Sequence, residues 1–410
     1  MNKTIDTVLS TFNYLRFFLP LLIGFGAFYL LIIGADWSLT ALEVFLAILA
    51  IEFILGNNSK DYEYKYPQIF VGMMYLFMVS TVITFWAYAW IMAFAHNGSD
   101  LFSLAAIVQS LTGFDMITAH IQNNWADFFL ATVLLSSISG IAALAVGHEL
   151  SHRTQEPVSV FLARLGGMLS MFTYYAIEHP YGHHFNVGTL EDSSTALRGE
   201  SVFAYFKRTA PQDYETAWEI EKLRLEKDGL EAWSVHNRLL RGYAAEASVI
   251  VFLFVVSGIA GVFWFMLAVL NTHFTYKLGT YGQHYGIVRV PGTPIDARHS
   301  WDSSNRFTYW FSNGIGRHVD HHLEPEKEFW ELKAYTEGPQ YLQGYMASIV
   351  LSTVPALWHK LMAPKLLEWD EKWASDDERA LAMDANLHSG VPALVEAAEN
   401  NYRQLHSKAS

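Results

Sequence analysis

The sequence predicts an all-α integral membrane protein of about six transmembrane helices, with a cytosolic helical cap that holds a metal site. Three observations predict this class. Of the 410 residues, 52% are apolar and 16% are charged, which is a low charged fraction for a soluble protein. Several uncharged runs reach the roughly 20 residues that cross a bilayer as a helix. Histidine clusters follow directly after two of the apolar runs.

The first expected spans are long apolar runs. Phe17–Ala35 and Ile69–Ala95 are uncharged and long enough to cross. Ser38–Gly56 carries Glu43 and Glu52, so we expect it to cross with both carboxylates facing protein rather than lipid.

Three further spans are expected at Phe128–Gly147, at Val158–Ile177 despite Arg164, and at Ala247–Leu270. The shorter run Leu101–Thr112 is expected to lie at the membrane interface. Six spans place both termini on one side, and the basic residues of the long polar connections assign that side to the cytoplasm of an inner-membrane protein. These residues are Arg198, Lys207, Arg208, Arg238 and Arg241.

The polar segments divide the rest of the chain. Thr216–Gly229 is amphipathic and charged, which predicts a soluble helix. Met346–Met362 contains Pro355 and Lys360 and is expected to form an interfacial helix. We expect a membrane domain at 1–147, a histidine-rich catalytic region at 148–345, and an interfacial helix with an acidic soluble tail at 346–410.

Charge and cysteine content exclude several functions. A net charge of −13 argues against a nucleic-acid partner, which would need clustered Lys and Arg. The acidic stretches Glu368–Asp370 and Asp376–Glu378 are expected to form a solvated tail. Because cysteine is absent, the chain cannot hold a haem–thiolate or a Cys-ligated iron–sulfur cluster, so electrons for redox chemistry must come from a separate protein.

Nine of the seventeen histidines fall into four short motifs. Residues 148–152 read HELSH, and positions four apart share one face of a helix, so both imidazoles can reach one metal region. The other motifs are EHPYGHH at 178–184, GQHYG at 282–286 and RHVDHH at 317–322. The predicted ligands are His148, His152, His179, His183, His184, His284, His318, His321 and His322.

Nine imidazoles are too many for one ion and fit two. Neutral imidazole suits zinc, copper, iron or nickel, and iron is the usual metal for oxygen activation. A zinc peptidase also carries His-Glu-x-x-His, but it would leave seven histidines unexplained. Four nearby side chains are expected to accept the second ring N–H of the ligands: Glu149, Glu178, Gln283 and Asp320.

The four motifs resemble those of the membrane-bound alkane monooxygenase and xylene monooxygenase family, over about residues 148–392. A section resembling EDxxxxxxGxSxxxFxxR follows the second motif, and His299-Ser300-Trp301 resembles another element of the family. The alkane group has Glu before the late histidine, whereas this chain has Gln283, as the xylene group does. The tail at 364–370 also resembles the xylene group, while EHPYGHH and RHVDHH resemble the alkane group.

The resemblance implies a di-iron site held by the nine histidines, two iron ions, O2, and two electrons from rubredoxin or a ferredoxin-type reductase. It also implies hydroxylation of a methyl C–H of a hydrophobic substrate (an alkane, or an alkyl-arene such as xylene or cymene). Arg153, Arg208, Arg238 and Arg241 are candidates for docking the carrier or for anchoring at the membrane surface.

Two other functions stay open. A membrane di-iron acyl-lipid desaturase or hydroxylase shares the imidazole clusters but commonly has HxxHH twice, whereas this chain has it once. A membrane metal transporter would bind exchangeable ions without consuming oxygen. Aromatic residues of the third apolar run are candidates for a substrate pocket, or else pack in the bundle or face lipid: Phe70, Tyr75, Phe85 and Trp86.

Overall fold

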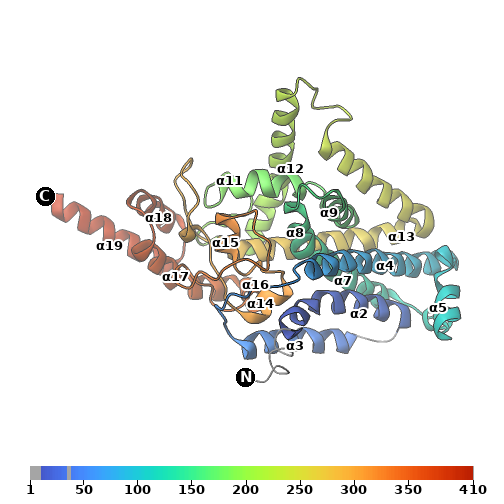
Figure 1. Ribbon diagram of the computed structural model, residues 1–410. Coiled ribbons are helices and arrows are strands. Elements are labelled where there is room, and N and C mark those ends of the chain that lie inside the picture. Colours follow the sequence, from blue (N-terminus) through green and yellow to red (C-terminus); the bar gives the residue numbers. More distant parts are fainter. Residues whose placement is uncertain (1–10, 35–37, 410) are drawn as a thin grey trace.

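The structure is a computed structural model that describes residues 11–34 and 38–409. Helices dominate this part of the chain, and its β-structure consists of the isolated bridges Asn57–Asn305 and Asp302–Gln340. The predicted all-α class is therefore confirmed. Long helices form a bundle, and most of the shorter helices gather at one of its ends, while α5 lies at the other (Figure 1). The long helices are α2 (Leu19–Ile33), α3 (Ser38–Leu55), α4 (Gln68–Asn97), α7 (Trp125–Ile141) and α13 (Arg238–Gln283).

Four helical segments of the described chain are long and apolar enough to cross a membrane: Thr11–Ile33, Gln68–Asn97, Trp125–His152 and Arg238–Gln283. These segments overlap four of the six expected spans. Large apolar side chains remain exposed on their outer faces, including Leu22, Val255 and Ile259. An apolar outer surface on long apolar helices is what a lipid environment requires, so the chain is a membrane protein.

The last of these segments bends back on itself. At about 1.5 Å per residue, the 46 residues of α13 would extend about 70 Å, more than twice a bilayer core. Gly258 interrupts the helix with φ 64° and ψ −167°, and a Cβ there would lie 2.8 Å from the His96 ring at the end of α4. The first leg runs away from the shorter helices and the second returns to them (Figure 1). The run Ala247–Leu270, expected to form one span, lies within this long apolar segment and straddles the turn at Gly258.

Two other expected helices are divided. In place of a span at Val158–Ile177, α9 (Pro157–Ser170) has 14 residues, and Met171 ends it in a left-handed conformation with φ 55°. A single turn, α10 (Tyr175–Glu178), follows. The expected interfacial helix at Met346–Met362 is split into α16 (Tyr345–Ser352) and α17 (Pro355–Lys372), because Pro355 starts a new helix.

Helix α3 carries two acidic residues with different surroundings. Glu52 is buried, as expected, and accepts hydrogen bonds from the Thr308 hydroxyl and the backbone N–H groups of Met346 and Ala347. Glu43 is exposed instead of facing protein. It lies five residues from the start of α3, about 8 Å along the helix, and is thus close to one end rather than mid-helix.

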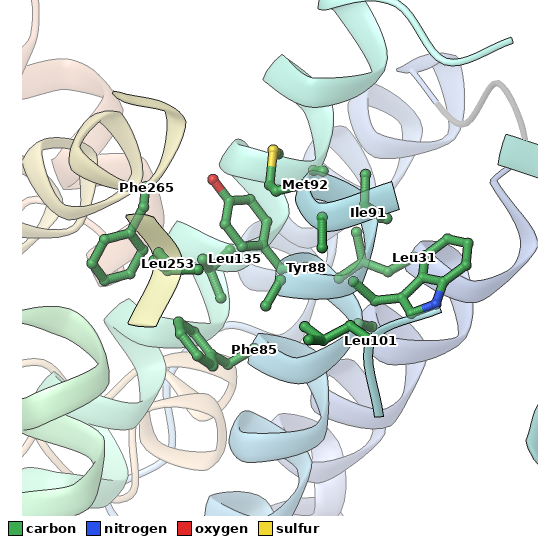
Figure 2. Packing of buried hydrophobic residues seen from close by; sticks show 14 of the residues in the cluster. Leu31, Phe85, Tyr88, Ile91, Met92, Leu101, Leu135, Leu253 and Phe265 are labelled. Atoms are coloured by element: carbon green, nitrogen blue, oxygen red, sulfur yellow. The ribbon is translucent and has the colours of Figure 1, made fainter. Parts of the chain in front are cut away.

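The bundle is held together by a core centred on α4, with contributions from α2, α7 and α13 (Figure 2). Tyr88 is fully buried among Leu31, Leu135 and Leu253. The four aromatic pocket candidates are also engaged in packing or hydrogen bonds: Phe70 stacks on Trp330, Phe85 meets Phe265, Tyr75 hydrogen-bonds Ser159, and Trp86 donates to Leu101 O.

The polar segments fold over one end of the bundle. The predicted helix at Thr216–Gly229 forms the second half of α12 (Val202–Lys227). The C-terminal part folds into α17, α18 (Asp376–His388) and α19 (Pro392–Ala409). The prediction of a solvated acidic tail was wrong for Glu378, which is buried and bonded to Arg298 and His299. The remaining short helices are α5 (Leu104–Thr112), α6 (Met116–His120), α8 (Gly147–His152), α11 (His184–Asn186), α14 (Arg306–Phe311) and α15 (His318–Leu323).

Candidate metal centre

The nine predicted histidines converge where the bundle meets the polar segments, and they form two groups. Within each group, one ring nitrogen per residue lies within 4.8 Å of the others. The five-histidine group contains His148, His152, His179, His184 and His321. The four-histidine group contains His183, His284, His318 and His322.

Helical spacing explains two pairs. His148 and His152 lie four apart on α8, with their Nε2 atoms 3.3 Å apart, and both belong to the five-histidine group. His318 and His322 lie four apart on α15, with their Nε2 atoms 3.1 Å apart, in the four-histidine group. His321, one residue away on α15, points to the other group, so a single helix serves both groups.

A π-helical turn at His179–His183 changes this spacing in the second motif. Its wider turn brings residues five apart onto one face, and the Nε2 atoms of His179 and His184 lie 3.2 Å apart. His183, four residues after His179, instead joins the four-histidine group. The adjacent pair His183–His184 is thereby divided between the groups, as His321–His322 is.

A second π-helical turn, Ala142–Val146, directly precedes α8. Gly147 follows it, and a Cβ there would lie 2.3 Å from the Ala142 carbonyl oxygen. The lack of a side chain at Gly147 therefore permits the displaced carbonyl that the π-helical turn creates. Both π-helical turns lie next to the histidine groups. Single π-helical turns within α-helices are frequently found at functional sites.

The spacing of the Nε2 atoms fits a shared cation. The Nε2 atom of His321 lies 3.1 Å from that of His148 and 3.1 Å from that of His184. In the other group, the Nε2 atom of His318 lies 3.1 Å from that of His284. Nitrogens bound at right angles to one ion at about 2.1 Å would be about 3.0 Å apart. A neutral imidazole nitrogen carries one proton or one lone pair, so it cannot satisfy two such neighbours by hydrogen bonds.

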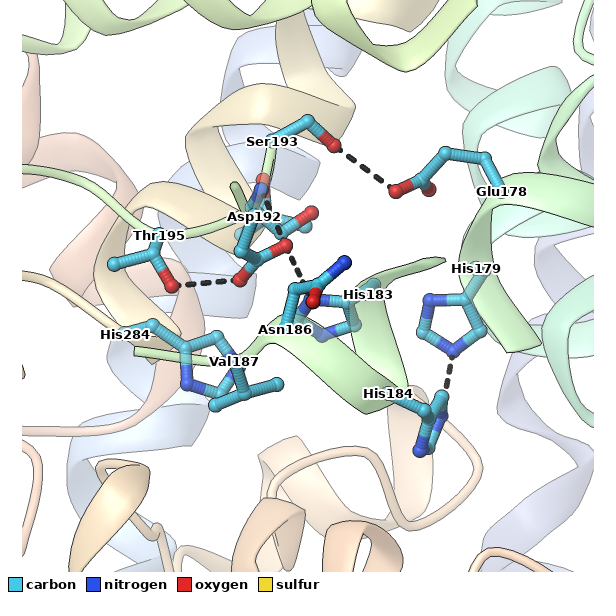
Figure 3. A network of polar contacts seen from close by, with 12 residues as sticks. Glu178, His179, His183, His184, Asn186, Val187, Asp192, Ser193, Thr195 and His284 are labelled. Atoms are coloured by element: carbon cyan, nitrogen blue, oxygen red, sulfur yellow. Dashed lines mark hydrogen bonds and ion pairs between the residues drawn. The ribbon is translucent and has the colours of Figure 1, made fainter. Parts of the chain in front are cut away.

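Two ligands of the four-histidine group are oriented through their Nδ1 atoms. His183 Nδ1 lies 2.9 Å from Asp192 Oδ1, and His284 Nδ1 lies 2.9 Å from the His299 carbonyl oxygen (Figure 3 shows Asp192 beside His183). Both oxygens are acceptors, so Nδ1 carries the proton and Nε2 presents its lone pair to the group. The Nδ1 atoms of His184, His318 and His322 are buried without a protein partner in the described chain.

Burial keeps the rings neutral. It lowers the pKa of His284 to about 3 and lowers the pKa of other ligands outside the spans well below the usual histidine value. These are His179, His184, His318, His321 and His322. Metal ligation needs the neutral imidazole, so burial holds the groups in the form that binds metal.

The four side chains predicted to accept a ring N–H have other partners in the structure. Glu149 accepts from Phe329 N, and Glu178 accepts from the Ser193 hydroxyl. Gln283 donates to the Tyr345 hydroxyl, and Asp320 accepts from Lys327 and from Lys333 N. The oxygens of Asp192 and of the His299 backbone take the expected role. Asp192 lies in the section that resembles EDxxxxxxGxSxxxFxxR, and His299 lies in the His-Ser-Trp element. The sequence does not show which oxygen atom will accept a hydrogen bond from a given histidine ring.

Comparison with known proteins agrees with this site. The profile of the fatty acid desaturase family matches residues 123–348, which is more than half of the chain and includes all nine histidines. The chain belongs to the fatty acid desaturase family. It is 29% identical to alkane 1-monooxygenase of Acinetobacter baylyi, over 60% of this chain and 61% of the relative. It is 30% identical to alkane 1-monooxygenase 2 of Alcanivorax borkumensis, over 57% of this chain and 62% of the relative.

This chain thus spans about three fifths of the length of those alkane monooxygenases. The match is longer for XylM, the xylene/toluene monooxygenase hydroxylase component of Pseudomonas putida. That relative is 30% identical over 64% of this chain and 71% of its own length. Within its family the chain therefore groups with the alkane and xylene monooxygenases.

Proposed function

We propose that the protein is a membrane monooxygenase that hydroxylates a methyl C–H bond of a hydrophobic hydrocarbon. The observation that carries this proposal is the convergence of nine imidazoles into two groups at the end of an apolar bundle. Relatives named alkane 1-monooxygenase and xylene/toluene monooxygenase share the region of the chain that contains those groups.

In this proposal each histidine group holds one iron ion. The donor set fits, because imidazole suits iron and one nitrogen of every ring lies within 4.8 Å of the others in its group. Two bound irons would supply the activation of O2 with two external electrons. The protein holds the ligands neutral, orients His183 and His284 through Nδ1, and surrounds the site with buried side chains that exclude water.

We propose six membrane spans, of which two differ from the sequence expectation. They are α2, α3, α4, α7 with α8, and the two legs of α13 on either side of Gly258. The first leg has 20 residues, about 30 Å, which matches a bilayer core. On this topology Glu43 of α3 lies near the headgroups at the end of the bundle remote from the histidines, where a carboxylate can reach water.

The distribution of basic residues supports a cytoplasmic histidine centre in an inner-membrane protein. No Lys or Arg occurs at residues 17–59, 66–152 or 242–276. The remote end of the bundle includes Gly34 at the end of α2, residues 98–124 and the turn at Gly258, and all of these fall inside these stretches. The Lys and Arg residues of the described chain thus lie toward the histidine end, which the positive-inside rule assigns to the cytoplasm.

The electrons would come from a soluble carrier such as rubredoxin or a ferredoxin-type reductase. Three of the four arginines considered for its docking already form ion pairs: Arg153 with Glu156 and Glu328, Arg208 with Glu200, and Arg238 with Glu221. Arg241 is exposed and has no ion pair among the described residues. Arg241 is therefore the strongest of the four candidates for contact with an acidic carrier.

Whole-cell conversion of octane, p-xylene and p-cymene under isotopically labelled O2 tests the activity. We expect an alcohol that carries the label from at least one substrate. An unlabelled alkene would instead support desaturation, the activity after which the matching family is named. Cells expressing His321→Ala serve as the negative control, because that variant loses a nitrogen at the centre of the five-histidine group. Purified wild-type protein with one zinc and no iron would contradict the proposal.

A further inference from the structure

A chain of hydrogen bonds joins the four-histidine group to the C-terminal helix α18. His284 Nδ1 donates to the carbonyl oxygen of His299, at 2.9 Å. The ring of His299 is fully buried, and its Nε2 lies 2.7 Å from Glu378 Oε1. Glu378 belongs to the first turn of α18, 94 positions after His284 in the sequence.

The direction of each bond in this chain is fixed by its partners. His299 Nδ1 accepts from the backbone N–H of Asp296, so the ring proton lies on Nε2 and is donated to the Glu378 carboxylate. The other carboxylate oxygen accepts from Arg298 Nε at 2.8 Å and from Ser375 N at 2.8 Å. Glu378 thus binds both side chains of the Arg298–His299 pair and holds the backbone that carries the acceptor for His284.

Neighbouring contacts hold the same segments against the C-terminal helices. Trp369 of α17 is buried and donates its indole N–H to the Arg298 carbonyl, at 2.7 Å. On the other side of His284, Arg198 donates to the Gly286 carbonyl and forms an ion pair with Asp370 of α17. The short 3-10 helix Ala297–His299 in turn packs against α15, which carries His318 and His322. The backbone on both sides of the His284 contact is therefore braced by the C-terminal helices.

We propose that Glu378 is a positioning residue for the four-histidine group: it acts through His299 to fix the ring of His284. This inference rests on the two-metal site of the proposed function and adds the C-terminal helices to its support. Loss of an outer hydrogen-bond partner of a histidine ligand commonly weakens metal binding about 10–100-fold. The five-histidine group has no contact with Glu378 in the described chain, so the effect is specific to one group.

The test compares Glu378→Ala and Glu378→Gln with Asp377→Ala in the purified, iron-loaded full-length protein. Asp377 is exposed on the same helix and controls for a loss of charge from α18. The readouts are iron per chain and the rate of iron release to a chelator, with thermal unfolding in detergent measured in parallel. We expect Glu378→Ala to release one of its two irons about 10–100-fold faster than wild type, while the other iron and Asp377→Ala behave as wild type.

Glu378→Gln retains an acceptor for His299 and should release iron at an intermediate rate, and it carries the test if Glu378→Ala does not fold. Wild-type release of both irons from the Glu378 variants would overturn the inference. Equal acceleration for both irons would also overturn it, because it would indicate a general loosening of the fold. A wild-type protein that cannot bind two irons would contradict the proposed function and remove this inference with it.

Discussion

The two histidine groups use the same ligand type but are supported differently. The five-histidine group is built from helices at the end of the bundle, with α8 and the His179–His183 π-helical turn supplying most of its rings. In the four-histidine group, two rings are fixed by oxygens of other segments: Asp192 in a loop, and the carbonyl of His299 at the end of the short 3-10 helix Ala297–His299. The five-histidine group is thus positioned by helix geometry, whereas the four-histidine group combines the helical pair His318 and His322 with contacts from other segments.

This difference has an electrostatic consequence. Burial alone would raise the pKa of the Asp192 carboxyl, but the interaction with His183 and the hydrogen bonds from His183 and Thr195 hold it below its usual value. It therefore places a negative charge behind one ligand of the four-histidine group. In the five-histidine group, no acidic side chain accepts a ring N–H among the described residues. A metal bound in the four-histidine group would consequently differ in affinity and in redox potential from a metal bound in the five-histidine group.

The largest expected effect comes from removing His321. The Nε2 atom of His321 lies 3.1 Å from that of His148 and 3.1 Å from that of His184. His321→Ala therefore removes the ring that lies between these two ligands in the five-histidine group. We expect loss of about one metal ion per chain, measured by elemental analysis, and loss of activity by at least ~100-fold.

The matched variant His318→Ala should lose the metal of the other group, and the exposed His388→Ala should keep both. If His321→Ala kept two metals and full activity, the division into two groups would be refuted.

Acidification of the metal-free protein should give the next largest effect. Burial lowers the pKa of the ligands outside the spans below the value near 6.5 that they regain on unfolding, to about 3 for His284. Below pH 6.5 the unfolded chain then binds more protons than the folded chain, so stability falls with pH, by about 1.4 kcal/mol per pH unit for each such histidine. Thermal unfolding between about pH 7.5 and about pH 5.5, one unit to either side of 6.5, measures this slope.

Alanine variants provide the internal control for acidification. A metal-free His322→Ala protein has one buried imidazole fewer and should show a shallower slope than the parent protein. A melting temperature that does not change over this pH range would show that the rings are solvated rather than buried.

Asp192→Asn tests the electrostatic difference between the groups. The amide keeps the size of the carboxylate but removes its charge from behind His183. We expect metal in the four-histidine group to bind about 10–100-fold more weakly, while the five-histidine group is unchanged. Competition with a chelator, followed by metal analysis, measures both affinities. Glu191→Gln is the control because Glu191 is exposed and adjacent; equal weakening in both variants would contradict a specific role for Asp192.

The sequence predicted the parts of the centre that depend on regular helix spacing. His148 with His152 and His318 with His322 follow the four-residue period, and the apolar runs located the bundle. The partnership of His179 with His184 depends on a π-helical turn that no spacing rule indicates. The turn at Gly258 lies within one continuous apolar run, so hydropathy could not reveal it. Glu378 lies in an acidic stretch typical of surface, and its burial depends on contacts with Arg298 and His299 from far away in the chain.

The smallest expected effect comes from Gln283→Glu, which places at this position the residue of the alkane group. Gln283 adjoins His284 but is not part of either histidine group; its amide donates to the Tyr345 hydroxyl at 2.9 Å, and that hydroxyl donates to Ile315 O. A glutamate would turn a donor into an acceptor, so Tyr345 could satisfy the carboxylate or Ile315 but not both. We expect loss of about 1–2 kcal/mol of stability in chemical unfolding and unchanged iron content. Loss or gain of iron in this variant would show that position 283 takes part in the metal centre, and that the loop-supported group extends beyond its four histidines.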